Sequence, residues 1–270
     1  MASIVLAGDA GRTLLAECPD ALLQFFDTRQ ACALRLVCRE LQAAVAAYPW
    51  EDRETVIRGS IGGWRACFPR ARCANLLQLE HYGGVVRRPS VVDADFVHFV
   101  GLRELSMGGC EAVTDAAFVH LRGIQRLKMT GCAQATITDA AFVSLAGIQS
   151  LNMSGCYQPT ITDAAFVPLA GIQSLDMSGC AQATITDAAF VHLAGIQSLD
   201  MSGCRQATIT NAALAPLKGI RSLDMSYCPQ IRFTDAACKL LAVIPELNIG
   251  GCIWRSTDIL AARAGLTTFF

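Results

Sequence analysis

The chain has 270 residues, and 53% of them are hydrophobic, which is enough apolar surface for a continuous core. Its 22 basic and 23 acidic residues give a formal net charge of −1, which excludes a general electrostatic attraction to nucleic acid or to an anionic membrane. No apolar run approaches the ~20 residues of a membrane span, and the start, Met1 to Asp9, lacks the basic region of a secretory signal peptide.

The first fifty residues divide into a leader and a helical segment. Residues 1–17 are expected to be a flexible leader. Within 18–50, Pro19 fits the first turn of a helix that continues to Phe26, and Asp20 is favourable near its positive end. A second helix is predicted over 31–47, because apolar residues recur there at helical spacing. These residues are Leu34, Val37, Cys38, Leu41 and Val45.

Three phrases of this segment, Pro19-Asp20-x-Leu22-Leu23, Leu34 to Leu41, and Trp50, resemble an F-box. An F-box docks onto the Skp-type adaptor of cullin-type ubiquitin ligases and often precedes leucine-rich repeats. The resemblance implies that the adaptor is held by Pro19, Leu22, Leu23, Phe26, Leu36, Val37 and Leu41. In that role part of the apolar stripe packs on the first repeats and part stays exposed. The link from Phe26 to Leu34 is shorter than in typical F-boxes, so an alternative is that these helices only cap a repeat domain.

Residues 51–90 are interpreted as degenerate first repeats, with a strand at Val56–Ile57, a helix over 61–68 and a strand over 77–79. Arg87 to Ser90 is expected to be a loop. Regular repeats and a C-terminal cap are assigned to 91–270.

A ten-residue phrase, Gly195 to Cys204, returns along most of this region with little change. Its closing cysteine recurs after 22 residues once and after 24 residues five times. The series is Cys110, Cys132, Cys156, Cys180, Cys204, Cys228 and Cys252. A fixed period of this size indicates a solenoid.

Each repeat is expected to form one strand and one short helix. Residues 198–202 alternate polar and apolar, so Leu199 and Met201 should point inward. Residues 186–195 predict a helix that Thr186 or Asp187 can cap. Because stacked strands lie ~4.8 Å apart whereas packed helices need ~8–10 Å, the strands should line the concave side.

The phrase Ile196-x-x-Leu199-x-Met201-x-x-Cys204, followed by Ile209-Thr210, resembles the cysteine-containing class of leucine-rich repeat. The resemblance covers residues 74–270. It implies an α/β solenoid, with a curved parallel sheet inside and short helices outside, preceded by a small N-terminal helical cap.

The sequence offers no catalytic site. The 13 cysteines include no Cys-x-x-Cys pair, and those of the series are expected to be buried, reduced thiols, as in the cytoplasm or nucleus. Three of the four histidines share a helix position where sibling repeats carry Ser144 or Pro168, which argues against a catalytic role. No enzyme activity, metal or cofactor is predicted.

One surface could bind a partner, namely the middle of the concave sheet. Its central residues are Ser106, Lys128, Asn152, Asp176, Asp200, Asp224 and Asn248. Three stacked aspartates would repel by roughly 1–3 kcal/mol per neighbouring pair and could attract a basic or amide-rich protein segment, or could simply keep the sheet soluble.

These features and the two resemblances imply a protein-interaction module, the substrate-recognition subunit of a cullin-type ubiquitin ligase. The alternatives are a scaffold without adaptor binding and a self-associating structural protein.

Overall fold

The computed structural model describes residues 23–50, 53–57, 59–76, 91–228 and 235–252. The chain divides into two compact units, Met1–Leu79 and Glu80–Phe270. The predicted leader, the start of the first helix, the strand at 77–79, the loop at 87–90 and the cap beyond Cys252 lie outside the described residues.

The first unit is a small helical module with two short strands. Its described elements are α3 (Thr28–Leu34), α4 (Arg39–Ala47), β1 (Glu54–Val56), α5 (Ile61–Cys67) and β2 (Cys73–Asn75). The two strands pair in parallel, with Glu54 opposite Cys73. The helix predicted over 61–68 is present as α5, whereas the predicted strand at 56–57 lies two residues earlier, at β1.

The single helix predicted over 31–47 is wrong, because two helices stand in its place. Asp27 and Gln30 form a capping box, so α3 begins before the predicted start. The chain then turns at 35–37, and Cys38 is extended, which ends one helix and starts the next. The apolar spacing continues across this break, so periodicity alone gives no sign of it.

Trp50 is the centre of the core of this unit. The side chain is almost fully buried, its ring packs edge-on against Phe68 at a centroid distance of 5.1 Å, and its Nε1 donates to the Val45 carbonyl at 2.8 Å. Arg53 adds a second tie by donating to the carbonyls of Leu23 and Phe26. The predicted continuation of the first helix to Phe26 is wrong, because the chain turns at 24–25, and the bonds from Arg53 hold this turn against the rest of the unit.

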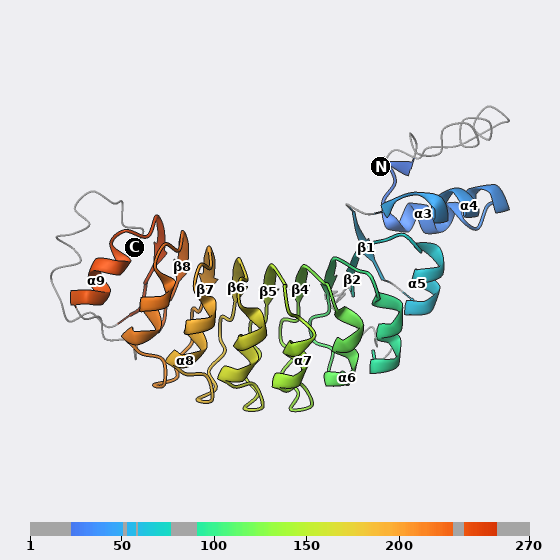
Figure 1. The fold of residues 1–270 in the computed structure, drawn as a ribbon. Coiled ribbons are helices and arrows are strands. Elements are labelled where there is room, and N and C mark those ends of the chain that lie inside the picture. The colour runs from blue at the N-terminus through green and yellow to red at the C-terminus, as the bar shows by residue number, and fades with distance from the viewer. Residues whose placement is uncertain (1–22, 51–52, 58, 77–90, 229–234, 253–270) are drawn as a thin grey trace. The chain divides into compact units, whose positions relative to one another are not determined.

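The second unit repeats one strand and one helical segment along its whole described length (Figure 1). Its strands are β3 (Glu104–Ser106), β4 (Arg126–Lys128), β5 (Ser150–Asn152), β6 (Ser174–Asp176), β7 (Ser198–Asp200), β8 (Ser222–Asp224) and β9 (Glu246–Asn248). Its α-helices are α6 (Asp115–Phe118), α7 (Asp139–Val143), α8 (Asp187–Phe190) and α9 (Asp235–Leu241). Its 3₁₀ segments are η2 (Asp93–Phe99), η3 (Val119–Leu121), η4 (Asp163–Leu169), η5 (Val191–Leu193) and η6 (Asn211–Leu217).

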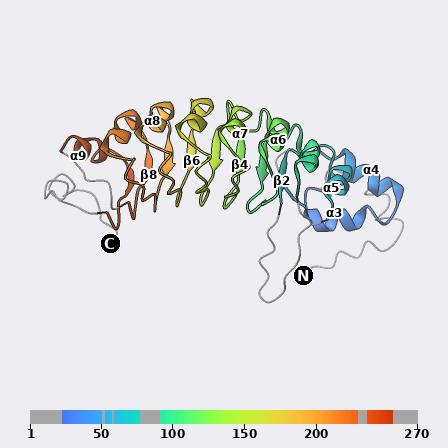
Figure 2. The same cartoon turned by 90° about the horizontal axis from the view of Figure 1, so that it is seen from below.

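The strands pair in parallel and strictly in register, each with the strand of the next repeat. In Figure 2 the strands follow the inner side of the arc of this unit and the helices follow the outer side. Leu199 and Met201 are buried, as predicted from the alternation, and so are their counterparts on β3 to β8, whereas Leu247 and Ile249 of the last repeat are half-buried. The predicted α/β leucine-rich-repeat solenoid is thereby confirmed for this unit.

The cysteine series forms a buried ladder beside the strands. Cys180 Sγ donates to the carbonyl of Met153 in the preceding repeat at 3.2 Å, and the same bond recurs from Cys132 to Cys252 at 3.0–3.5 Å. Each thiol therefore satisfies a backbone acceptor of its neighbour while filling the core as a small apolar group.

A second ladder joins the helical segments. Thr186 caps its own helix by accepting from the N–H of Ala188, and its N–H and Oγ1 both donate to Asp163 of the preceding repeat at 2.7 Å. The same two hydrogen bonds link the other Asp–Thr pairs along 93–210. Where Pro168 and Pro216 stand, the segment is 3₁₀ throughout, because proline lacks the donor that an α-helix needs.

Candidate functional site

The predicted central residues of the concave sheet lie in one row, which we call the inner strip. Each is the last residue of its strand, and consecutive members are register partners from Ser106 on β3 to Asn248 on β9. Neighbouring strands lie ~4.8 Å apart, so the seven side chains form a continuous polar row about 29 Å long. The structure therefore brings all seven residues together; the binding role of this strip remains a prediction.

Most carboxylates and amides of the inner strip also hold the turn that follows their strand. Asp176 Oδ1 accepts from the backbone N–H of Ser178 at 3.0 Å and from its Oγ at 2.7 Å, and Asp224 does the same with Ser226. This is the Asx turn that short polar side chains favour. The sequence had suggested only solvation or partner binding for these residues, so a structural role was missed.

Asp200 differs from the aspartates on either side of it. Asn152 Nδ2 donates to Asp176 Oδ2 at 2.6 Å, and Asn248 Nδ2 donates to Asp224 Oδ2 at 2.7 Å. Asp200 accepts only from the N–H of Ser202, at 2.9 Å, and its second oxygen has no hydrogen-bond partner in the described part of the chain. The middle of the inner strip therefore presents one carboxylate oxygen that is free to accept from a partner.

Positive charge lies on the same face at the β3–β4 end of this unit. Arg126 Nε donates to Glu104 at 2.8 Å, and Lys128 Nζ lies 3.9 Å from the same carboxylate. The Arg126 and Lys128 side chains are each more than half exposed. The concave face is thus basic at β4 and acidic over β6–β8.

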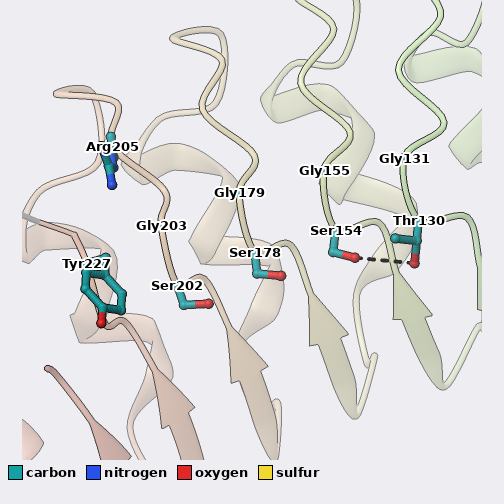
Figure 3. Close-up of a pocket in the computed structure, with 10 residues that line it drawn as sticks. All are labelled: Thr130, Gly131, Ser154, Gly155, Ser178, Gly179, Ser202, Gly203, Arg205 and Tyr227. Carbon is teal, nitrogen blue, oxygen red and sulfur yellow. Dashed lines mark hydrogen bonds between the residues drawn. The ribbon is translucent and has the colours of Figure 1, made fainter. Parts of the chain in front are cut away.

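A shallow groove of about 490 Å³ runs beside the inner strip, along the turns that follow the strands (Figure 3). Hydroxyl side chains and glycines alternate along it, and Arg205 and Tyr227 stand at one end. The residues that line it are Thr130, Gly131, Ser154, Gly155, Ser178, Gly179, Ser202, Gly203, Arg205 and Tyr227. This groove is a surface that the sequence analysis did not identify.

Tyr227, at one end of the groove, breaks the pattern of the repeats. Its φ is 57°, in the left-handed region, whereas the corresponding position of five preceding repeats is a glycine of positive φ. Its ring is exposed and lies over Gly251, where an added Cβ would approach Tyr227 Cδ1 to 2.7 Å. Alignment of the repeats with one another would have revealed this aromatic group, because it interrupts a series of glycines at Gly109, Gly131, Gly155, Gly179 and Gly203.

In the first unit, the F-box-like side chains separate into buried and exposed sets. Leu23 and Leu41 are buried, and Phe26 is half-buried. Leu36 is 89% exposed and Val37 is 66% exposed, both in the turn between α3 and α4. The stripe is thus divided between buried and exposed side chains, and its role in holding an adaptor stays a prediction. Pro19 and Leu22 lie outside the described residues, and an exposed apolar group that the sequence analysis did not select, Phe25, precedes Phe26.

Eleven cysteines, those whose side chains the structure describes, are free thiols. Within the same residues, no group of three or more His, Cys, Asp or Glu side chains is placed to hold a metal ion. No helix among them has the length and apolar character needed to cross a membrane.

No protein-family profile and no curated protein matches this chain. Solved structures do match its fold. TLR13 in its complex with ssRNA13 aligns with a TM-score of 0.55 at 15% identity, over 82% of this chain and 35% of that one. Rad7 in its yeast complex with Elc1 aligns with a TM-score of 0.54 at 17% identity, over 82% and 58%. Toll in its complex with Spatzle, from Drosophila, aligns with a TM-score of 0.51 at 12% identity, over 85% and 37%.

These similarities establish a shared leucine-rich-repeat fold. The chain spans between about a third and three fifths of the length of the three proteins. The structure and the comparisons together thus identify a leucine-rich-repeat solenoid.

Proposed function

We propose that this protein acts by binding and not by catalysis, as the substrate-recognition subunit of a cullin-type ubiquitin ligase in a reducing compartment, the cytoplasm or the nucleus. In this role the concave face of the second unit holds the substrate protein, and the α3–α4 region of the first unit holds a Skp-type adaptor. The observation that carries the adaptor assignment is the exposure of Leu36 and Val37 in the turn between two short helices. Exposed apolar side chains that lie together on a soluble surface are a recognised feature of protein–protein interfaces.

The buried members of the stripe explain how the turn is presented. Leu23 and Leu41 pack inside the unit, and Arg53 ties the backbone at Leu23 and Phe26 to it. Leu36 and Val37 contribute to no core in the described residues, so their apolar surface is available to a partner at little conformational cost. Rad7, whose fold is similar, was solved in a complex with Elc1, which supports the proposal that this kind of chain binds a protein partner.

The adaptor assignment is tested by affinity capture with a purified Skp-type adaptor. A Leu36→Glu/Val37→Glu double variant should lose adaptor binding and keep the melting temperature of the native chain, because both side chains are exposed. Ala43→Glu, an exposed position on α4, is the matched control and should bind normally. If the unmodified chain captures no adaptor, the alternative of a scaffold without adaptor binding replaces the proposal.

On the concave face, the positions of the charged side chains and the distance between strands indicate which charge pattern a bound segment would need. Lys128 lies three strands from Asp200 and four from Asp224, or ~14 and ~19 Å at ~4.8 Å per strand. An extended polypeptide advances ~3.3 Å per residue and presents alternate side chains to one face. If an acidic residue of the bound segment lies over Lys128, the fourth and sixth residues after it lie over Asp200 and Asp224. We therefore propose that the substrate segment has an acidic residue followed by basic residues at positions +4 and +6.

A synthetic peptide with this charge pattern tests the assignment by fluorescence anisotropy. Asp200→Lys should weaken its binding roughly two- to five-fold at low salt, as expected for exposed ion pairs, and added salt should remove the difference. A peptide with the same composition and its basic residues at +3 and +5 is the control. Equal binding of both peptides would contradict a register set by the strands.

A further inference from the structure

The groove along the turns of the second unit and the inner strip form one surface, because hydrogen bonds join their residues. Ser178 lines the groove, and its hydroxyl donates to Asp176 of the inner strip at 2.7 Å. Ser202 lines the groove as well, and its backbone N–H donates to Asp200 at 2.9 Å. A segment whose backbone lies in the groove can therefore direct basic side chains to the carboxylates of the inner strip.

Arg205 places a positive charge at the end of the groove that lies beside the acidic part of the inner strip (Figure 3). Its side chain is exposed, and no ion pair or hydrogen bond joins it to any residue that the structure describes. The corresponding position in three preceding repeats is Ala133, Tyr157 or Ala181, so the repeat itself does not require a cation there. A guanidinium without a partner favours a carboxylate in the occupant of the groove, because its planar fork of donors fits two oxygens.

Tyr227 obstructs the same end of the groove. Its ring is 62% exposed and lies over Gly251 of the next turn, where an added Cβ would come within 2.7 Å of Tyr227 Cδ1. The four preceding turns that line the groove carry a glycine at this position: Gly131, Gly155, Gly179 and Gly203. The ring thus stands where the groove would continue into the last repeat. A segment that follows the groove from β4 has to end at Tyr227 or leave the surface there.

These two observations indicate how the substrate segment ends. The segment proposed for the concave face has an acidic residue over Lys128 and basic residues at +4 and +6, over Asp200 and Asp224. Asp224 ends β8 and Tyr227 stands in the turn that follows, so +6 is the last residue that fits before the ring. We infer that the segment is the C-terminus of the substrate protein, that it ends at +6, and that its terminal carboxylate pairs with Arg205.

This inference rests on the concave-face proposal and adds the class of substrate to it. The direction of the segment agrees with the charge of Arg205, because a segment running the other way would place a terminal ammonium beside the guanidinium and be repelled. An acidic side chain within a longer chain offers the same two oxygens. That chain, however, would have to continue past the Tyr227 ring.

Three synthetic peptides test the inference by fluorescence anisotropy. All carry the acidic residue and the basic residues at +4 and +6. One ends at +6 with a free carboxylate, one ends there as an amide, and one continues for three glycines and ends as an amide. The free acid should bind roughly two- to five-fold more tightly than the short amide at low salt, as expected for an exposed ion pair. The extended amide should bind more weakly than the short amide, because Tyr227 obstructs its last residues.

Three variants identify the groups responsible. Arg205→Gln should abolish the preference for the acid over the short amide. Arg221→Gln is the matched control, because Arg221 is also exposed but precedes β8, at the end of the strand away from the groove, so the preference should persist. Tyr227→Gly restores the residue of the other turns and suits the φ of 57° at this position. In this variant the extended amide should bind as tightly as the short one.

The outcomes separate this inference from the proposal on which it rests. Equal binding of the acid and the short amide would overturn the inference while the charge pattern of the concave face stands. A preference for the acid that Arg205→Gln leaves unchanged would also overturn it, since another group would then hold the carboxylate. So would an extended amide that binds the native chain as tightly as the short one. If none of the three peptides binds, the concave-face proposal fails, and the inference fails with it.

Discussion

Alkaline conditions should unfold the repeats, because the cysteine ladder is buried in its neutral form. Burial first, and the neighbouring Cys228 second, raises the pKa of Cys204 from its ordinary value of 9.0 to about 12. Burial raises the pKa values of Cys156 and Cys180 still further, helped by Cys180 and Cys204 respectively. In the unfolded chain these thiols would ionise near pH 9. Above that pH the unfolded state binds fewer protons than the folded state, so stability falls as pH rises.

The size of the effect follows from these three thiols and from Cys228, whose pKa burial raises to about 12 as well. Each contributes a loss of ~1.4 kcal/mol per pH unit between the unfolded and folded pKa values, so four give ~5 kcal/mol per unit. Against a typical total stability of ~5–15 kcal/mol, this predicts unfolding between about pH 10 and 12. Below pH 9 the contribution is fully present, and stability should change little with pH from this cause.

The measurement is urea unfolding, followed by circular dichroism, at several values from pH 8 to pH 10.5. Cys204→Ala should lower the slope of unfolding free energy against pH by ~1.4 kcal/mol per pH unit, about one quarter, because one of the four thiols is gone. An unfolding free energy that is constant over this range would refute a ladder of buried neutral thiols.

Two further substitutions test which face of a strand is turned to the core and which is turned to solvent. Leu199→Ala should lower the unfolding free energy by ~2–5 kcal/mol in urea melts, since a fully buried leucine leaves a cavity between two repeats. Asp200→Asn should be neutral or slightly stabilising, because the new Oδ1 can still accept from the Ser202 N–H while repulsion from neighbouring carboxylates is relieved. A larger loss for Asp200→Asn than for Leu199→Ala would contradict the assignment of the two faces.

Much of the repeat domain could be predicted because one signal recurs in the same place. The cysteine period defines the length of each repeat, and the strand register follows since every strand stands at the same offset from its cysteine. Alternation within residues 198–202 identified the buried leucine and methionine. The threonine cap also followed, because an N-cap depends on a few neighbouring residues.

Other features depend on contacts that cannot be predicted from the spacing of apolar residues. The turn at 35–37 leaves the apolar spacing intact, so the break between α3 and α4 was missed. A helical stripe indicates which residues share a face, but packing around Trp50 and Arg53 decides that Leu23 is buried and Leu36 exposed. The Asx turns of Asp176 and Asp224 depend on side-chain rotamers and on neighbouring asparagines, none of which alternation reveals.

A last pair of substitutions separates two kinds of glutamine that the repeats place at one position. Gln134 Nε2 donates to the carbonyls of Cys110 and Val113 at 2.6 and 3.1 Å. Gln134 is half-buried and Gln206 is buried, yet neither polar atom of the Gln206 amide has a partner among the described residues. Gln134→Leu should therefore cost ~1–3 kcal/mol, because it strands acceptors that lose their donor, whereas Gln206→Leu should be neutral or stabilising. Gln182→Leu, whose amide is equally unpartnered, should behave like Gln206→Leu in urea melts. A greater loss of stability for Gln206→Leu than for Gln134→Leu would contradict this reasoning. It would mean that water held between the repeats satisfies the Gln206 amide, and that the hydrogen bonds of Gln134 do not set it apart.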